Sequence, residues 1–465
     1  MKVTGFKSHP YIPNSAPETE LEMLKEIGLT SLEQLHAEVP KELILNELMD
    51  LPKAFESEYE LRRHVEKLLG KNKSCAENLN FLGAGCWQHY VPAVCDEING
   101  RGEFLTAYGG ESYNDFGRFQ SLFEYESLMA ELLDMEVVSV PTMDYAQAAA
   151  TAIRMGTRIA ARSKVLVSGN VDPERLTVIK NYCDSDLDIV SLKLDEATGC
   201  VDLADLRAKL DSSVGVVYFE NPSYLGVLEV SAAEIAKVAH DAGAQCVVGV
   251  DPISLGILEP PHSYGADIVC GDLQPLGIHM NYGGGQSGFI ATMDDPKYVL
   301  EFPSRLFGIC ATEVPGEYAF GDVAYDRTSF GHLREKAKEY VGTQSALWGI
   351  TAGVYLSLMG PEGMKEVDET ILQQAQYAAA KIAELPNVSL KWSTPFFKEF
   401  VVDFSKTGKT VSKINKALLE CSIFGGKDLS KEFPALGQCA MYCVTEIHTK
   451  EDLDYLVSSL KKVLA

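Results

Sequence analysis

No stretch of the sequence approaches 18 consecutive apolar residues, although 46% of its 465 residues are hydrophobic. A transmembrane helix needs about 20 such residues, so the sequence predicts none. The opening residues MKVTGFKSHP also lack the apolar segment of a secretory signal peptide. We therefore expect a soluble, cytoplasmic protein whose apolar residues suffice for a sizeable core in two or three domains.

Basic residues are in the minority, with 41 lysines and arginines against 66 aspartates and glutamates, for a formal net charge of −25. A field of that sign repels phosphate backbones, so nucleic acid is not an expected partner. Acidity that keeps the protein in solution is the simpler explanation of this charge.

Cysteine pairs of the Cys-x-x-Cys type are absent, and the eleven cysteines are scattered along the chain. Cys439 and Cys443 are the closest pair, and no Cys/His cluster lies near them at the spacing of a zinc finger. We expect reduced cysteines that serve as small core residues, and no bound metal.

Several common catalytic and nucleotide-binding motifs are also missing. The sequence GAGCWQ at residues 83–88 lacks the third glycine of a dinucleotide fingerprint and follows no clear strand. No G-x-x-x-x-G-K-[ST] phosphate loop, H-E-x-x-H zinc motif or G-x-S-x-G nucleophile motif is present. These absences argue against nucleotide, metalloprotease and serine hydrolase functions.

The patterns that are present predict an α/β fold. Amphipathic turns with a possible Thr30 or Ser31 cap predict an N-terminal helical arm at 1–75. Apolar strands then alternate with helices in a large domain at 76–340, which predicts a mostly parallel, doubly wound sheet. A long helix broken at Gly360-Pro361 leads into a small α+β domain, and the two together occupy 341–465. The predicted strands of the large domain are KVLVSG, DLDIVSLKL, GVVYFENP, CVVGVDP, DIVCGD and SGFIATM.

Polar side chains follow three of these strands, where ligands bind in open α/β sheets. Asn221 follows GVVYFE, Asp251 follows CVVGV, and Asp272 follows ADIVCG. Neighbouring strands would place Asn221 and Asp251 side by side. An aspartate there can keep a pyridinium nitrogen protonated, and an asparagine can bind a ring oxygen. The alternative is that Asn221-Pro222 and Asp251-Pro252 are ordinary turns that end strands.

Residues 266–292 resemble the segment that presents the Schiff-base lysine in type I pyridoxal phosphate (PLP) enzymes. A strand, a loop with Gly283 and Gly284, and a return strand follow one another, and the glycines allow close approach of a phosphate or a neighbouring subunit. A His-Lys pair usually precedes such glycines, whereas this chain has His279 and Met280. No lysine occurs between positions 237 and 297, so the chain cannot form the internal aldimine by itself.

Residues 104–126 form a further candidate ligand loop. The segment is rich in glycine, tyrosine and acidic groups and precedes a predicted helix. Its aromatic rings could stack on a cofactor ring, or the segment could be an ordinary connection. The candidate residues adjacent to cofactor or substrate in this loop are Tyr108, Glu111, Tyr113 and Asn114.

Ordered blocks over nearly the whole chain resemble one family. They include FLGAGCWQHYVPAV, LFEYESLMAELLDM, VGVDPISLGILEPPHSYGADIVCGDLQPLG, VYLSLMGPEGM, PFFKEFVV and CVTEIHTKEDLDYLV. Together they are similar to subunit 1, the alpha chain, of two-subunit glycine decarboxylases, which are the P-proteins of the glycine cleavage system. Tyr108, Asp251 and Gly284 match positions of the family pattern.

The resemblance implies a type I PLP fold and an α2β2 assembly. The homologous subunit 2 would supply the lysine and hold most of the cofactor. Glycine would be decarboxylated, with carbon dioxide released and the aminomethyl group passed to the lipoyl arm of the carrier H-protein, whose disulfide is the oxidant. No catalytic residue is then expected in this chain.

The chain departs from the family pattern at several loops. GGESYNDFG stands where TPYQPE and ISQG are usual, NYGGGQSG replaces SFGGPYLG, and MDYAQAA replaces YDGATA. Two further functions therefore stay open. The chain could belong to a paralogous PLP enzyme for another small amino acid, or it could be a non-catalytic scaffold or regulator.

Overall fold

The computed structural model describes residues 11–45, 47, 49–105, 116–304, 306–323, 338 and 345–465. The chain forms two compact units, Met1–Lys73 and Ser74–Ala465. The division at residues 75 and 340 into arm, large domain and small domain stays a prediction. No helix in the described ranges has both the length and the apolar character needed to cross a membrane.

The N-terminal unit consists of short helices, as predicted. Those of five residues or more in its described part are α1 (Pro17–Glu26), the 3-10 helix η2 (Leu32–His36) and α2 (Glu58–Leu69). The predicted cap at Ser31 is confirmed, because Ser31 and Gln34 form a capping box at the start of η2. Within the described part of this unit, Leu24 is the only buried residue, so its own core is very small.

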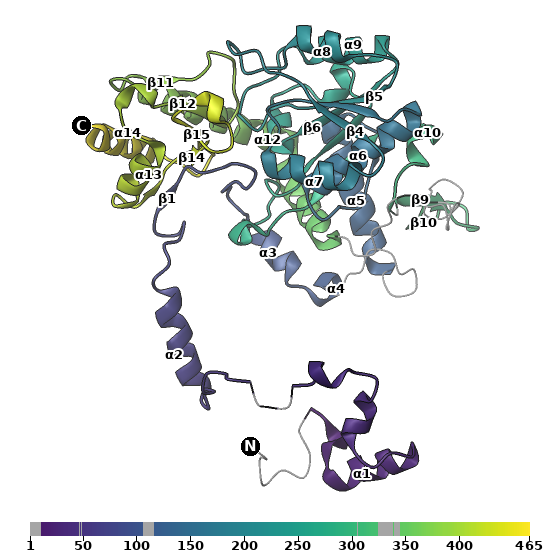
Figure 1. The fold of residues 1–465 in the computed structure, drawn as a ribbon. Helices are drawn as coiled ribbons and strands as arrows, with labels where there is room; N and C mark the ends of the chain where they lie inside the picture. Colours follow the sequence, from purple (N-terminus) through teal and green to yellow (C-terminus); the bar gives the residue numbers. More distant parts are fainter. Residues whose placement is uncertain are drawn as a thin grey trace. The chain divides into compact units, whose positions relative to one another are not determined.

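A seven-stranded sheet forms the centre of the second unit (Figure 1). Its order is β2-β8-β7-β6-β5-β3-β4, and the four pairings from β7 across to β4 are parallel, whereas β8 pairs antiparallel with β7 and β2. The predicted mostly parallel sheet is therefore confirmed. The strands are β2 (Val137–Val138), β3 (Lys164–Val167), β4 (Asp188–Ser191), β5 (Val214–Glu220), β6 (Gln245–Val250), β7 (Ile268–Asp272) and β8 (Gly288–Thr292).

Helices cover both faces of this sheet, so its central strands are apolar on both sides. Strand β5 shows this directly, because Val216 and Tyr218 belong to a core with α6 and α7, whereas Val217 and Phe219 belong to the opposite core with α5, α9 and α12. The described α-helices from the start of this unit through α12 are α3 (Ala93–Asn99), α4 (Gly102–Leu105), α5 (Phe116–Leu133), α6 (Tyr145–Ala160), α7 (Pro173–Cys183), α8 (Leu203–Lys209), α9 (Ala232–Asp241), α10 (Pro296–Val299) and α12 (Ala346–Ala383).

A four-stranded antiparallel sheet follows α12, with the order β11-β12-β15-β14. The predicted break in α12 is confirmed, because Gly360 has φ +59° and ψ −179°. Helices α13 and α14 lie beside this sheet in Figure 1. The elements are β11 (Ser389–Leu390), β12 (Glu399–Asp403), α13 (Val411–Leu419), β14 (Lys427–Asp428), β15 (Cys439–Cys443) and α14 (Lys450–Leu464).

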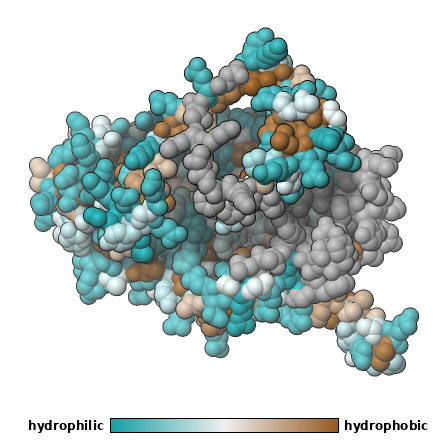
Figure 2. Space-filling view, turned by 90° about the horizontal axis from the view of Figure 1, so that it is seen from below, coloured by the Kyte–Doolittle hydropathy of each residue, from teal (hydrophilic) through white to brown (hydrophobic). Residues whose placement is uncertain are grey.

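Two smaller strand pairs complete the fold. Strand β1 (Leu79–Asn80) pairs in parallel with β13 (Ile423–Phe424), and β9 (Phe307–Ala311) forms an antiparallel hairpin with β10 (Tyr318–Asp322). On the face shown in Figure 2, hydrophilic residues predominate among the coloured atoms, in agreement with the acidic composition.

Gly226 marks the point where the loop after β5 contacts β12. It has φ +84°, and a Cβ atom there would lie 2.1 Å from the carbonyl oxygen of Glu399. Gly226→Ala should therefore lower the free energy of unfolding by about 2–4 kcal/mol, through backbone strain plus overpacking. Gly408→Ala is the matched control, because Gly408 has φ +72° with open space around it. Equal losses in chemical denaturation would show that the contact with Glu399 is unimportant.

Candidate functional site

The carboxyl ends of β5 and β6 face a small cavity of about 30 Å³. Its wall combines the loop before α3, helices α6 and α7, the ends of β5 and β6 with the loop after β5, and the start of β12. The lining residues are Gly85, Trp87, Tyr145, Arg175, Glu220, Pro222, Ser223, Tyr224, Gly226, Asp251, Lys398 and Glu399. The cavity therefore lies where the sequence predicts a ligand site.

Asp251 is buried at the end of β6 and forms an ion pair with Lys398. The Lys398 Nζ lies 2.6 Å from the Asp251 Oδ2, and the two side chains are 3% and 9% exposed. The other carboxylate oxygen accepts a hydrogen bond of 3.4 Å from the backbone N–H of Ile253. The Lys398 ammonium also lies 3.8 Å from the centre of the Trp87 ring, a cation–π contact. The carboxylate is thus already neutralised within the chain.

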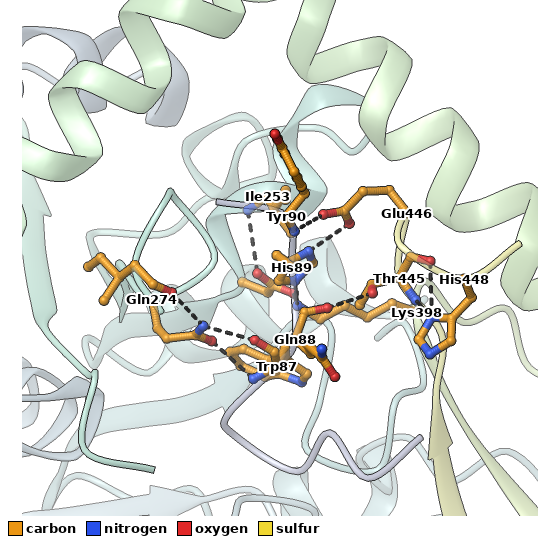
Figure 3. A network of polar contacts seen from close by, with 12 residues as sticks. Trp87, Gln88, His89, Tyr90, Ile253, Gln274, Lys398, Thr445, Glu446 and His448 are labelled. Atoms are coloured by element: carbon orange, nitrogen blue, oxygen red, sulfur yellow. Dashed lines mark hydrogen bonds and ion pairs between the residues drawn. The ribbon is translucent and has the colours of Figure 1, made fainter. Parts of the chain in front are cut away.

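Lys398 is held on its other side by His89 (Figure 3). The His89 Nε2 lies 3.1 Å from the Lys398 Nζ, and its Nδ1 lies 2.8 Å from a carboxylate oxygen of Glu446. An ammonium can only donate, so His89 accepts at Nε2 and donates from Nδ1–H, as the neutral ring does. Burial opposes ionisation of Glu446, but the hydrogen bonds that it accepts from the His89 Nδ1–H and from the backbone N–H of Tyr90 lower the pKa of its carboxyl group.

The residues that carry His89 form a strap, which we define as residues 83–90. The Gln274 amide holds the strap by exchanging hydrogen bonds with the backbone N–H and C=O of Trp87, at 3.0 and 2.8 Å. The Thr445 hydroxyl donates to the carbonyl oxygen of Gln88 at 2.7 Å. The strap is therefore anchored to both sheets, as Figure 3 shows.

A second buried ion pair also lines the cavity. The Arg175 Nη1 lies 2.5 Å from the Glu220 Oε1, to which the Tyr218 hydroxyl also donates at 2.9 Å. The guanidinium lies 3.7 Å from the centre of the Tyr145 ring. Burial raises the pKa of Glu220 above its usual value, although Arg175 opposes this.

The residues predicted at the other two strand ends, Asn221 and Asp272, lie nearby, but their side chains accept hydrogen bonds from backbone groups of the same chain. Asn221 follows β5, next to the end of β6, and its Oδ1 accepts from the backbone N–H of Glu229 at 3.0 Å. Asp272 ends β7 and accepts from the backbone N–H groups of Gln274 and Ser287 at 2.8 and 3.3 Å. Burial raises the pKa of Asp272 to about 7.

The glycine segment after β7 forms a tight loop. His279 is exposed, and its Nε2 lies 3.0 Å from an Asp96 carboxylate oxygen. Gly285 needs to be glycine, because a Cβ atom there would lie 2.0 Å from the carbonyl oxygen of His279. Gly283 has φ +91° and open space around it, and Gly284 lies at the loop surface. The candidate loop residues Tyr108, Glu111, Tyr113 and Asn114 lie outside the described residues.

PLP does not fit this cavity. A volume of about 30 Å³ accommodates water, whereas cofactor pockets measure roughly 300–1,000 Å³. Lys398 occupies the position beside Asp251 that a ring nitrogen would need. The N-terminus of α6, which could bind a phosphate, is capped by the Asp144 carboxylate. Met280 provides no amine.

Short-range sequence patterns do not predict which residues line the cavity. Lys398 lies in the block PFFKEFVV and His89 in the block FLGAGCWQHYVPAV, and both blocks indicate the family but not the contacts of these two side chains. A lysine beside an apolar strand is the signal that could have indicated a buried ion pair. The residues that sequence reasoning missed are Trp87, His89, Tyr145, Arg175, Glu220, Lys398, Glu399 and Glu446.

Low-identity comparisons with solved structures support the fold class. A sphingosine-1-phosphate lyase of Burkholderia pseudomallei has a TM-score of 0.64 at 12% identity, covering 90% of this chain and 92% of its own. A NifS-like protein of Rickettsia africae has a TM-score of 0.61 at 14% identity, covering 83% and 99%. The predicted α/β fold of type I PLP enzymes is confirmed.

Closer relatives match nearly the full length. A crystal structure of glycine decarboxylase (P-protein) of the glycine cleavage system, in inhibitor-bound form, has a TM-score of 0.83 at 34% identity and covers 96% of this chain and 98% of its own. Proteins named probable glycine dehydrogenase (decarboxylating) subunit 1 are 38% identical in Staphylothermus marinus and 39% identical in Pyrococcus abyssi, each over 98% of this chain and at least 98% of the relative. The model of the glycine cleavage system P-protein family matches residues 9–460, and the chain therefore belongs to this family.

Proposed function

We propose that this chain is subunit 1 of a two-subunit glycine decarboxylase and that it is active only with subunit 2. Full-length similarity to proteins named as that subunit supports the assignment. In the proposed reaction, glycine loses carbon dioxide and its aminomethyl group passes to the lipoyl arm of the H-protein. The proposed location is the reducing cytoplasm, where the eleven cysteines would stay reduced.

The filled cavity is the observation that carries this division of labour. PLP chemistry needs an amine nucleophile to hold the cofactor, and Met280 stands at the matching position. The ion pairs of Lys398 and Arg175 fill the remaining space. We therefore assign the lysine and the cofactor to subunit 2, in an α2β2 complex. The candidate loop residues and the glycine loop are proposed to lie near the cofactor or substrate of that partner.

The test is the exchange of labelled bicarbonate into the carboxyl group of glycine. This chain, co-expressed with its lysine-bearing homologue and supplied with a lipoylated carrier, should catalyse the exchange, and either subunit alone should not. Borohydride reduction followed by peptide mapping should place the PLP adduct on the partner alone. The control is a pair whose partner lysine is replaced by alanine.

Other outcomes would each exclude part of the proposal. An adduct on this chain would contradict the assignment of the lysine. Turnover of another small amino acid, with no glycine exchange, would select a paralogous enzyme. Full exchange by the partner alone would reduce this chain to a scaffold or regulator.

A further inference from the structure

Lys398 connects the two larger sheets of the second unit. It immediately precedes β12 of the four-stranded sheet, and its ammonium reaches the carboxylate that ends β6 of the seven-stranded sheet. The side chain is 3% exposed, so water does not compete for this contact. The pair therefore joins the sheets through a buried, direct ion pair.

We propose that Lys398 is a built-in replacement for the cofactor's ring cation, and that its pair with Asp251 locks the four-stranded sheet onto the seven-stranded sheet. The carboxylate retains the position that suits a pyridinium, while the cation now comes from the chain itself. This inference does not depend on the substrate of the proposed enzyme.

The ion pair of Lys398 and Asp251 is part of a chain of contacts in which each side chain is held by the next. Glu446, after β15, accepts from His89 on the strap, and His89 accepts from Lys398, which donates to Asp251. The Trp87 ring lies against the ammonium from the side. A buried ammonium that left these partners would lose both its hydrogen bonds and its counter-charge. Lys398 therefore stays at Asp251.

Other contacts also join the strap and the loop after β5 to the segment around Lys398. The ion pair is therefore one of several contacts between these parts of the chain. The Glu399 carboxylate, beside Lys398, accepts from the backbone N–H of Ala84 at 2.7 Å. The backbone N–H of Leu228, after β5, donates to the carbonyl oxygen of Pro395 at 2.8 Å. Removal of Lys398 should therefore loosen the contact between the two sheets and leave each sheet intact.

The test uses hydrogen exchange on the full-length chain. Lys398→Met should leave Asp251 buried without its cation, and amides at 251–257 and 398–403 should exchange about tenfold faster or more. The double variant Lys398→Met/Asp251→Asn removes both charges and should recover most of the protection. Lys427→Met is the matched control, because its ion pair with Glu432, at 2.7 Å, is 35% and 26% exposed.

Chemical rescue gives a second measurement. Lys398→Ala removes the propylammonium end of the side chain, so added propylammonium should raise the melting temperature of this variant, whereas tetramethylammonium, which has no N–H group, should not. Equal responses to the two salts count against the proposal. It is overturned if Lys398→Met exchanges like the Lys427→Met control, or if the double variant is as unprotected or unfolded as the single one.

Discussion

Arg175→Met should lower the free energy of unfolding by about 3–5 kcal/mol, because it leaves the buried Glu220 carboxylate without its counter-charge. The guanidinium binds Glu220 at 2.5 Å and also lies against the Tyr145 ring, so the substitution removes both contacts. Methionine keeps most of the side-chain volume, so the loss reports charge more than packing. Denaturant midpoints, with hydrogen exchange at β5 as a local probe, provide the measurement.

Two further variants separate the ion pair from its surroundings. Arg175→Met/Glu220→Gln removes both charges and should recover at least half of the lost stability. Arg207→Met is the surface control, because Arg207 and its partner Glu234 are about half exposed. This control should cost less than about 1 kcal/mol. Similar losses at Arg175 and Arg207 would show that the buried pair contributes no more than a surface pair.

Asp368→Asn should stabilise the protein at alkaline pH and have little effect near pH 4. Asp368 lies on α12 and is buried. Burial and, next, the nearby Asp251 carboxylate raise the pKa of Asp368 to about 9. The unfolded value is about 4, so between pH 4 and 9 the native state holds a proton that the unfolded state releases. Wild-type stability therefore falls as the pH rises through this window.

Asparagine cannot ionise, so Asp368→Asn should not show the loss of stability that Asp368 causes between pH 4 and 9. The gain at pH 9 should be on the order of a few kcal/mol. Asp272 and Glu399, each with a pKa raised by burial to about 7, should still cause a decline between about pH 4 and 7. Melting temperatures from pH 4 to 9 measure the difference. The exposed Asp454→Asn is the control, and a pH-independent effect of Asp368→Asn would contradict the assignment.

Glu446 acts in the opposite direction. Its pKa is lowered, so its contribution to stability is present above its unfolded value near 4.5 and is lost as the pH falls through the lowered pKa. The loss of stability at low pH therefore reports Glu446, whereas the loss between pH 4 and 9 reports Asp368, Asp272 and Glu399.

Local sequence patterns predicted the fold because strand and helix signals act over short distances. The apolar run GVVYFE became β5, and the break at Gly360 was confirmed. The position of Asp251 after β6 also followed from the pattern. These features depend on residues within one element and its neighbours.

The contents of the cavity could not be predicted, because they depend on contacts between distant segments. Lys398 and Asp251 meet only after both sheets have packed. Arg175 lies in a helix whose sequence, PERLTVIKNYC, is typical of a surface helix, yet its guanidinium is buried. The side chain of Asn221 turns to its own loop through the N–H of Glu229, a choice that spacing alone does not reveal.

The packing around Asp251 also limits how this chain could evolve. A cofactor ring would meet a space of about 30 Å³, with Lys398 already at the carboxylate. Room for a cofactor there would need changes at Lys398, Arg175 and Asp144 together, and the loss of one buried charge at a time is costly. Single substitutions in this cavity should therefore be tolerated less well than paired ones that remove both charges of an ion pair.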